Sequence, residues 1–478
     1  METAQAPQEG AAALDGILQA LKAAWQREPY PTLATRLGWL ERLERLITTH
    51  ADDLAQAVSL DFGHRSPVET ELAEFFPSLQ ASRHARRHLA RWMRPQRRGV
   101  SLWFQPARAE VRPQPVGVVG IIVPWNYPVF LALGPLVAAL AAGNRVMIKM
   151  SEYTPHTGAL LARLVAAHFG DDVIRVVNGD VTVAEAFSRL PFDHLLFTGS
   201  TAVGRHVMQA ASANLTPVTL ELGGKSPVIV TPGFDAGRAA RRIVAGKMLN
   251  AGQTCVAPDY VLVHESDRTA LMTALVEAAR QYYPTLAENP DYSAIIHPRQ
   301  YQRLQDWLEE ARSGGATIVP VNPANEDLTP VRKLPLTLVW GAPAQCRLMR
   351  EEIFGPLLPV VGYRDVDEAL AYVAERPRPL ALYLFDDDRR RVRQVLERTI
   401  AGGVTVNDTV LHVAQDDLPF GGVGPSGMGH YHAHEGFLTL SKLKPVLYQS
   451  RFNGMALTAP PYGRRIRWLL RWMLGRRP

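Results

Sequence analysis

Cysteine is nearly absent from this chain of 478 residues, which contains only Cys255 and Cys346. Two cysteines give no sign of a disulfide framework, so we expect a reducing, cytoplasmic environment. The first residues contain no basic region followed by an apolar run, and the sequence therefore predicts no secretory signal. The apolar run at residues 129–142 is too short for a transmembrane helix, because a bilayer requires about 20 residues.

Acidic residues are absent from the last stretch of the chain, YGRRIRWLLRWMLGRRP, which contains six arginines. These arginines account for the net charge of +6, so the rest of the chain is close to neutral. A nucleic-acid-binding protein would carry a basic face on its folded body, and we therefore expect no nucleic-acid partner. A second basic cluster at residues 83–98 is interpreted as a solvated helix face or a contact between subunits.

Strand and helix patterns alternate along most of the chain, after a helical region at residues 11–99. The expected strands, with helices between them, lie at residues 116–124, 145–152, 173–179, 194–200 and 217–224. This alternation predicts a parallel sheet with helices on both faces, and a second alternating block follows it. The fold class is therefore α/β, and a ligand is expected at the carboxyl ends of the strands.

Three glycine-containing motifs could bind phosphate. GVGPSG at residues 422–427 matches the dinucleotide fingerprint, but it lacks the preceding strand and the following helix that the motif requires. GKS at residues 224–226 lacks the upstream glycine of a P-loop. FTGSTAVG at residues 197–204 is a better candidate, because it follows a strand and opens a helix whose N–H groups can bind a pyrophosphate. An ordinary turn capped by Ser200 is an equally open interpretation.

Cys255 lies in the stretch NAGQTCVAPDY, among small and polar residues rather than in an apolar run. A free cysteine most commonly serves as a small buried hydrophobe. A cysteine that is exposed at a bend of the backbone can instead act as a nucleophile. The residues around Cys255 leave both interpretations open.

Seven segments occur in a fixed order: PWNYP, KMSE, FTGSTAVG, TLELGGKSP, GQTCVAPDY, EEIFGP and LPFGGVGPSGMG. Over residues 15–448 the chain closely resembles the aldehyde dehydrogenase superfamily. TPVTLELGGKSP, CVAPDY and GGVGPSGMG are similar to its class 3 branch, which includes fatty and aromatic aldehyde enzymes. Within that branch, GHYHAHEGFLTLSK and the basic tail resemble the bacterial enzymes that act on coniferyl aldehyde. The resemblance implies NAD(P)-dependent oxidation of a hydrophobic aldehyde, aromatic or aliphatic, to the carboxylic acid.

The resemblance also implies three catalytic residues. Cys255 would attack the aldehyde carbon and form a thiohemiacetal, and loss of a hydride to the nicotinamide would leave a thioester. The amide of Asn126, with the Cys255 backbone N–H, would hold the developing oxyanion. Glu221 would act as the general base that activates water for hydrolysis of the thioester.

The cofactor would be NAD, with NADP left open. Lys149 and Glu152 would hold the adenosine ribose, and Glu152 should repel a 2′-phosphate, although class 3 relatives often accept both cofactors. The full set of cofactor-binding residues that the resemblance implies is Trp125, Lys149, Glu152, Gly199, Ser200, Gly204, Glu352 and Phe354. Gly199 and Ser200 would contact the pyrophosphate, and Glu352 and Phe354 the nicotinamide ribose and ring.

The domain organisation follows from the same resemblance: a Rossmann-type cofactor domain, an α/β catalytic domain and a small β extension for oligomerisation in a homodimer. The expected bounds are 1–99 and 114–224 for the cofactor domain, 225–411 for the catalytic domain, 100–113 and 412–450 for the extension, and 451–478 for a basic tail. Cys346 is interpreted as a packing residue. The histidines of HYHAH have no accompanying cysteine or carboxylate cluster, so we predict no metal site. Met150 and Ala433 depart from the proline and glycine common in related sequences.

The basic tail has a pattern of its own. Its apolar residues fall on one helix face, namely Ile466, Leu469, Leu470, Met473 and Leu474. A helix of about 12 residues would reach only ~18 Å and could not span a bilayer. Residues 462–476 could lie on the anionic inner face of a membrane, or pack near the substrate entrance or a partner subunit.

Two other functions remain open at this point. A non-catalytic structural or binding paralogue would keep the fold and lose the chemistry, whereas this chain retains Cys255, Glu221, Asn126 and Lys149. A thioester hydrolase or acyl-transfer enzyme would use Cys255 without redox chemistry, and the set of cofactor contacts argues against it.

Overall fold

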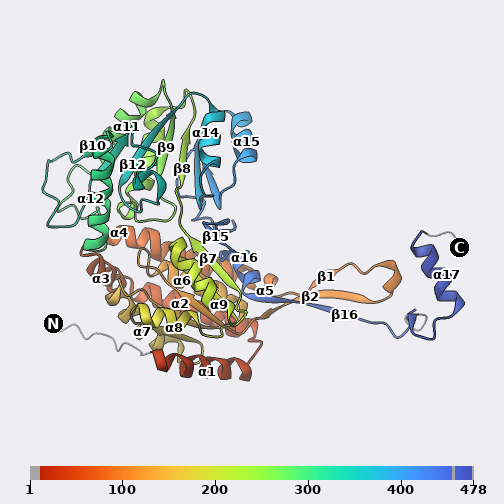
Figure 1. The fold of residues 1–478 in the computed structure, drawn as a ribbon. Coiled ribbons are helices and arrows are strands. Elements are labelled where there is room, and N and C mark those ends of the chain that lie inside the picture. The colour runs from red at the N-terminus through yellow and green to blue at the C-terminus, as the bar shows by residue number, and fades with distance from the viewer. Residues whose placement is uncertain (1–10, 455–457, 476–478) are drawn as a thin grey trace.

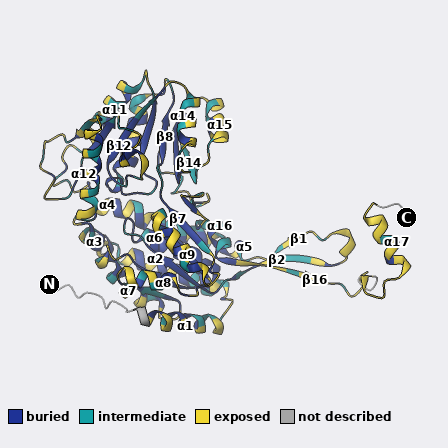
Figure 2. Ribbon diagram, in the orientation of Figure 1, coloured by how far each residue is buried: buried dark blue, intermediate teal, exposed yellow. Residues whose placement is uncertain are grey.

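The computed structural model describes residues 11–454 and 458–475. Three sheets organise the chain, two in the body and one in an arm that projects from it (Figure 1). The sheets of the body are buried between helices, whereas the outer end of the arm is largely exposed (Figure 2). The α/β architecture predicted from the alternating strand and helix patterns is confirmed.

The first sheet has six strands in the order β15-β7-β6-β3-β4-β5, and all are parallel except β15, which is antiparallel to β7. Its central strands β3 and β4 are fully buried and largely apolar, as expected for parallel strands covered on both faces, although Arg145 and Lys149 stand at the two ends of β4. The strand bounds are β3 Val118–Ile122, β4 Arg145–Lys149, β5 Ile174–Val177, β6 His194–Gly199, β7 Val218–Leu222 and β15 Gly427–Met428. The helices between them are α6 Phe130–Ala142, α7 Pro155–Phe169, α8 Val181–Ser188 and α9 Thr201–Ser212.

The second sheet has seven strands in the order β10-β11-β12-β9-β8-β13-β14, of which only β10 is antiparallel to its neighbour. The strand bounds are β8 Pro227–Val230, β9 Tyr260–His264, β10 Thr317–Val321, β11 Leu336–Trp340, β12 Leu357–Tyr363, β13 Ala381–Phe385 and β14 Gly403–Val406. The helices are α10 Ala236–Met248, α11 Arg268–Tyr282, α12 Pro298–Ser313, α13 Arg347–Arg350, α14 Val366–Ala374 and α15 Arg389–Arg398, with a short 3₁₀ helix, η3, at Leu249–Gly252.

Helices precede the first sheet, but the predicted helical region is too long at its end. The last of these helices stops at Trp92, and residues 96–98 form strand β1 instead. Pro95 explains the difference, because proline cannot continue a helix and restricts the residue before it. The bounds are α1 Ala11–Arg27, α2 Leu33–Thr49, α3 Ala51–Phe62, α4 Pro67–Thr70, the π-helix η1 Glu71–Phe75 and α5 Phe76–Trp92.

The arm is a three-stranded antiparallel sheet in the order β1-β2-β16, and a helix, α17, lies at its outer end (Figure 1). The rings of Trp103 and Trp472 lie 5.6 Å apart, so α17 contacts the short helix η2 that follows β1. The bounds are β1 Gln96–Arg98, η2 Leu102–Phe104, β2 Arg108–Pro115, α16 Ala433–Thr439, β16 Ser441–Tyr448 and α17 Arg464–Met473. Helix α17 lies within the segment for which the tail pattern predicts a helix.

Candidate active site

The loop that carries Cys255 follows α10 through a tight turn. Asn250 and Ala251 both adopt a left-handed φ of 51°, which is uncommon for residues other than glycine. The turn is buried, and it is held by the Gln253 side chain, which donates to the carbonyl of Asn250 at 3.0 Å. Cys255 itself is half-buried and free. The sequence therefore bends the backbone at this point, as the small and polar residues indicated.

Asn126 lies against this loop. Its side-chain amide donates to the carbonyl of Gln253 at 3.2 Å, and its own carbonyl accepts from Asn250 and from Arg65, each at 3.0 Å. One residue further, the hydroxyl of Tyr127 lies 2.6 Å from that of Thr254. The segments PWNYP and GQTC are thus tied together by several hydrogen bonds, although about 130 residues separate them along the chain.

Glu221 on β7 is buried, and neither of its carboxylate oxygens has a hydrogen-bond partner among the described residues. Burial raises the pKa of this carboxyl well above its ordinary value. The neighbouring strand places Thr198 directly opposite Glu221, and the Thr198 hydroxyl is also buried without a described partner. The sequence analysis predicted the adjacent Gly199 as a site residue but not Thr198. The position of Thr198 near the end of a parallel strand, where ligands bind, could have indicated it.

Cys255, Glu221 and Glu352 interact electrostatically, and we call the region around these three residues the catalytic chamber. A Cβ on Gly223 would lie 2.0 Å from a Glu352 carboxylate oxygen, so Glu352 packs directly on the backbone that follows Glu221. Burial raises the pKa of the Cys255 thiol to about 12, and the charges of Glu352 and Glu221 add to the effect. Burial, with the charge of Asp259, raises the pKa of Glu352 to about 8. The chamber therefore stabilises the neutral forms of all three groups.

The predicted cofactor residues lie at neighbouring strand ends of the six-stranded sheet. Lys149 ends β4, is buried, donates to the Met150 carbonyl at 2.7 Å and lies 3.8 Å from Glu152. Burial lowers the pKa of Lys149. Ser200 follows β6 and caps α9 by accepting from the Val203 N–H at 3.3 Å. Because β3 lies between β4 and β6, these residues and Trp125 line one edge of the sheet.

The nicotinamide end of the expected site is built by EEIFGP. Phe354 adopts a left-handed φ of 52°, and Gln300 donates to its carbonyl at 3.2 Å. The Phe354 ring lies 5.3 Å from that of Trp125 in a T-shaped arrangement. One buried carboxylate oxygen of Glu352 has no partner in the part of the chain that the structure describes. Strand-end geometry, a helix N-terminus and an unpaired buried carboxylate together fit a bound dinucleotide.

Lys225, from the GKS motif rejected as a P-loop, has a structural contact instead. Its ammonium group is bonded to the Asp259 carboxylate and donates to the carbonyls of Leu348 and Glu351, each at 2.9 Å. Asp259 in turn accepts from the backbone N–H of Ile353 at 2.9 Å. This ion pair therefore positions the EEIFGP segment.

Gly204, another residue of the predicted cofactor set, lies in α9 and packs against Leu222 of β7. It therefore brings α9 close to the sheet rather than facing solvent.

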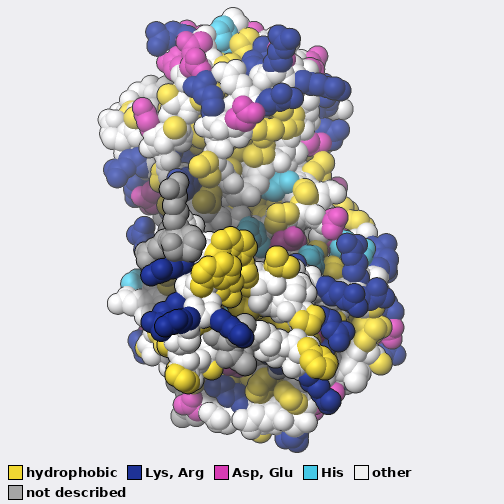
Figure 3. All heavy atoms as spheres, turned by 90° about the vertical axis from the view of Figure 1, so that its right-hand side faces the viewer, with side chains coloured by type: hydrophobic (Ala, Val, Ile, Leu, Met, Phe, Trp, Pro, Cys, Tyr) yellow, Lys and Arg dark blue, Asp and Glu magenta, His cyan; other side chains and the backbone are white. Residues whose placement is uncertain are grey.

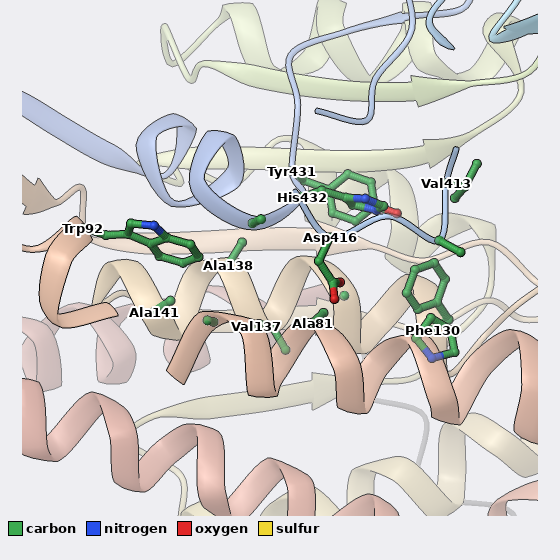
Figure 4. Close-up of a pocket in the computed structure, with 15 residues that line it drawn as sticks. Ala81, Trp92, Phe130, Val137, Ala138, Ala141, Val413, Asp416, Tyr431 and His432 are labelled. Carbon is green, nitrogen blue, oxygen red and sulfur yellow. The ribbon is translucent and has the colours of Figure 1, made fainter. Parts of the chain in front are cut away.

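A pocket lies between α5, α6 and residues 413–433 (Figure 4). Its walls are largely apolar and include Trp92, Phe130 and several alanines. Tyr431 and His432 line it on the side of the C-terminal segment. Gly427, four residues before Tyr431, lies opposite Glu221 in the pairing of β15 with β7, so this segment links the wall of the pocket to the region of Glu221.

The part of the chain that the structure describes contains neither a candidate metal cluster nor a helix that could span a membrane. Among residues 11–454 and 458–475, no group of three or more histidine, cysteine or acidic residues could hold a metal ion. No helix in these ranges is long and apolar enough to cross a membrane. Cys346 is buried in the hydrophobic core, as predicted for a packing residue.

The fold and the chamber define a class: an α/β enzyme with a dinucleotide site along one sheet edge and a cysteine beside a buried carboxylate. Residues 1–446 match the model of the aldehyde dehydrogenase family, and the chain belongs to that family. It is an NAD(P)-dependent aldehyde dehydrogenase, an oxidoreductase, and the predicted family and activity are confirmed. No comparison supports either alternative function, namely a non-catalytic paralogue or a thioester hydrolase.

Proteins that are similar to this chain agree with this assignment. A probable coniferyl aldehyde dehydrogenase of Pseudomonas aeruginosa is 54% identical and covers 96% of this chain and 95% of its own. Aldehyde dehydrogenase family 3 member A2 of Rattus norvegicus is 38% identical, with 87% and 84% covered. The substrate-bound structure of Staphylococcus aureus AldH superposes with a TM-score of 0.90 at 37% identity, covering 96% and 99%. A Mycobacterium tuberculosis aldehyde dehydrogenase with NAD+ has a TM-score of 0.84 at 26% identity, covering 93% and 91%.

Proposed function

We propose that the chain oxidises aromatic aldehydes of the coniferyl type to their carboxylic acids. The observation that carries this proposal is the pocket between α5 and α6, which is largely apolar, has the aromatic side chains of Trp92 and Phe130 in its walls, and is linked to the region of Glu221 by the segment that carries Tyr431 (Figure 4). Aromatic rings pack favourably against one another in such surroundings. The 54% identity with a relative named as a probable coniferyl aldehyde dehydrogenase points in the same direction.

The proposed roles of the chamber residues follow from their positions. The Cys255 thiolate attacks the aldehyde carbon, and the Asn126 amide, which is hydrogen-bonded to the loop of Cys255, stabilises the oxyanion that develops. A bound nicotinamide ring supplies the hydride acceptor for this chemistry. Glu221, unpaired and with a raised pKa, then removes a proton from the water that hydrolyses the thioester. Burial of the chamber limits the entry of other water.

NAD is the proposed cofactor in preference to NADP. The Glu152 carboxylate lies 3.8 Å from Lys149 at the end of β4, where the adenosine ribose is expected. A carboxylate at this position accepts hydrogen bonds from ribose hydroxyls and repels a 2′-phosphate. The adenosine and pyrophosphate half of the cofactor would be held by Lys149, Glu152, Gly199, Ser200 and the neighbouring Trp125. The nicotinamide half would be held by Glu352 and Phe354.

The test is the initial rate of NADH formation with four aldehydes: coniferyl aldehyde, benzaldehyde, hexanal and a long-chain aldehyde, each with NAD and with NADP. We expect the highest kcat/KM with coniferyl aldehyde and NAD, because the pocket has aromatic walls and Glu152 disfavours the extra phosphate. A ranking led by the long-chain aldehyde would contradict the aromatic assignment while leaving the family activity in place.

We also propose that the enzyme is a homodimer. The β16 strand forms an edge of the three-stranded sheet over eight residues, and an unpaired edge can pair with a second copy. The other elements of the arm reach away from the body, where a partner could contact them (Figure 1). This supports the expected role of the arm in oligomerisation.

A peripheral contact of residues 462–476 with the inner face of a membrane is our proposal for the tail, in an otherwise cytoplasmic enzyme. Helix α17 buries only Ile466, while Trp468 and Trp472 are 59% and 61% exposed. The exposed Leu102, Trp103 and Phe104 of η2 lie beside it, so apolar side chains gather at the tip of the arm, with arginines next to them (Figure 3). The chain contains no acidic residue after Glu435, which favours an anionic surface.

Flotation with liposomes tests the membrane proposal. We expect the full-length chain to float with vesicles that contain phosphatidylglycerol, and a 1–458 truncation to lose at least ~10-fold of that binding, because it lacks six arginines and both tryptophans of the tail. Vesicles of phosphatidylcholine alone are the control, and they should bind both forms weakly. Equal flotation of the two forms would contradict the membrane proposal. If light scattering shows that the truncated form no longer dimerises, the result would favour packing of the tail on the partner subunit.

A further inference from the structure

Tyr431 is a buried group that the mechanism above does not use. Its side chain is 1% exposed, and its hydroxyl has no hydrogen-bond partner within the described ranges. An unpaired buried hydroxyl is costly, so such a group normally meets a ligand or a water molecule. The Glu221 carboxylate has the same property, because both of its oxygens are buried and unpaired in the same region.

The glycine-rich segment 422–427 explains how Tyr431 reaches the site. Strand β15 pairs with β7 so that Gly427 lies directly opposite Glu221. Gly427 has a φ of 143°, and a Cβ there would lie 2.2 Å from the carbonyl oxygen of Leu220, so only glycine allows this approach. Four residues after Gly427 comes Tyr431. The motif thus fits closely against β7 instead of binding a dinucleotide, and the chain reaches Tyr431 four residues after the position opposite Glu221.

The Tyr431 ring is fixed on several sides. It makes T-shaped contacts with Phe420 at 5.9 Å and with His432 at 4.6 Å. A Cβ on Gly134 of α6 would lie 3.4 Å from the ring, and the ring lines the pocket together with His432 (Figure 4). A ring held in this way can place its hydroxyl in one direction with little loss of entropy.

The charges of two catalytic residues act on the Tyr431 hydroxyl. Burial raises the pKa of the phenol well above its ordinary value, and the charges of Glu221 and Cys255 raise it further. The hydroxyl therefore stays protonated throughout the working pH range. It can accept one hydrogen bond through its oxygen and donate another.

We propose that Tyr431 is a further catalytic residue, whose hydroxyl oxygen holds the water that hydrolyses the thioester on Cys255. The inference rests on the proposed roles of Cys255 and Glu221. One hydrogen of the water is donated to the Tyr431 oxygen and the other to Glu221, which leaves a lone pair free to face the thioester carbon. The water oxygen bonds to that carbon as Glu221 takes a proton. The C–S bond then breaks, and the acid and the Cys255 thiolate are released.

The experiment measures deacylation alone in Tyr431→Phe. p-Nitrophenyl acetate acetylates Cys255 and releases p-nitrophenolate without any cofactor. After rapid removal of excess ester, intact-mass spectrometry follows the decay of the acetyl adduct. We expect acylation within about twofold of wild type and a decay rate about tenfold lower, as for the loss of one hydrogen bond to a positioned water. With aldehyde and NAD, the variant should then show a burst of NADH followed by a slow steady rate.

Tyr363→Phe is the matched control, because it removes a buried tyrosine hydroxyl that donates to the Val230 carbonyl at 2.8 Å in the second sheet. It should leave both rates unchanged. Unchanged deacylation in Tyr431→Phe, or an equal fall in acylation and deacylation, would overturn the proposal. A wild-type enzyme that is acylated but forms no NADH with any aldehyde would instead overturn the proposed function, so the two failures are distinguishable.

Discussion

Cys255→Ala is expected to lower the rate of NADH formation by about 10⁴-fold or more, because the variant lacks the thiol that attacks the aldehyde. The cost corresponds to about 5.5 kcal/mol of transition-state stabilisation. The variant should keep its fold and its affinity for the dinucleotide, since Cys255 makes no side-chain hydrogen bond that the structure records and lies on a loop held by Asn126, Gln253 and Asn250. Stopped-flow absorbance for NADH, with titration of NAD binding, makes the measurement.

The second cysteine provides the control for this prediction. Cys346 is 3% exposed and packs in the core before α13. Cys346→Ala should therefore keep the wild-type kcat and lose only a modest amount of stability, of about 1 kcal/mol. NADH formation at wild-type rates by Cys255→Ala would show that the thiol is not the nucleophile, and a lost rate in both variants would point to misfolding.

The sheets were predictable because parallel strands that are buried on both faces appear as continuous apolar runs. The segments VVGII and RVMIK form β3 and β4, within a few residues of the expected bounds. The end of the helical region was wrong, because an arginine-rich run after Trp92 continues the helical pattern past Pro95. In that case, the proline was the better guide than the periodicity.

The chamber was predictable only where a motif marked it. Cys255 and Glu221 lie in the recognisable segments GQTCVAPDY and TLELGGKSP. Thr198 and Tyr431 were missed because strand pairing places each of them near Glu221. Thr198 lies opposite it across β6 and β7, and Tyr431 follows the pairing of β15 with β7, about 200 residues away along the chain. Sequence spacing does not encode such a register. The contact of Lys225 with Asp259 was missed for the same reason.

Glu221→Gln is expected to lower steady-state turnover by about 10²–10⁴-fold, because it removes the base that activates the water. Formation of the thioester does not need this base, so the first turnover should survive as a burst of one NADH per active site.

The pH dependence follows from the raised pKa of the Glu221 carboxyl. A base must be deprotonated to act, so kcat of the wild type should rise as the pH passes upward through this raised pKa, above the ordinary range of a glutamate. The residual rate of Glu221→Gln should lack that rise. Glu221→Asp, which keeps a carboxylate on a shorter side chain, should recover part of both the rate and its pH dependence. Loss of the NADH burst in Glu221→Gln would contradict the role, because it would place Glu221 in the formation of the thioester rather than in its hydrolysis.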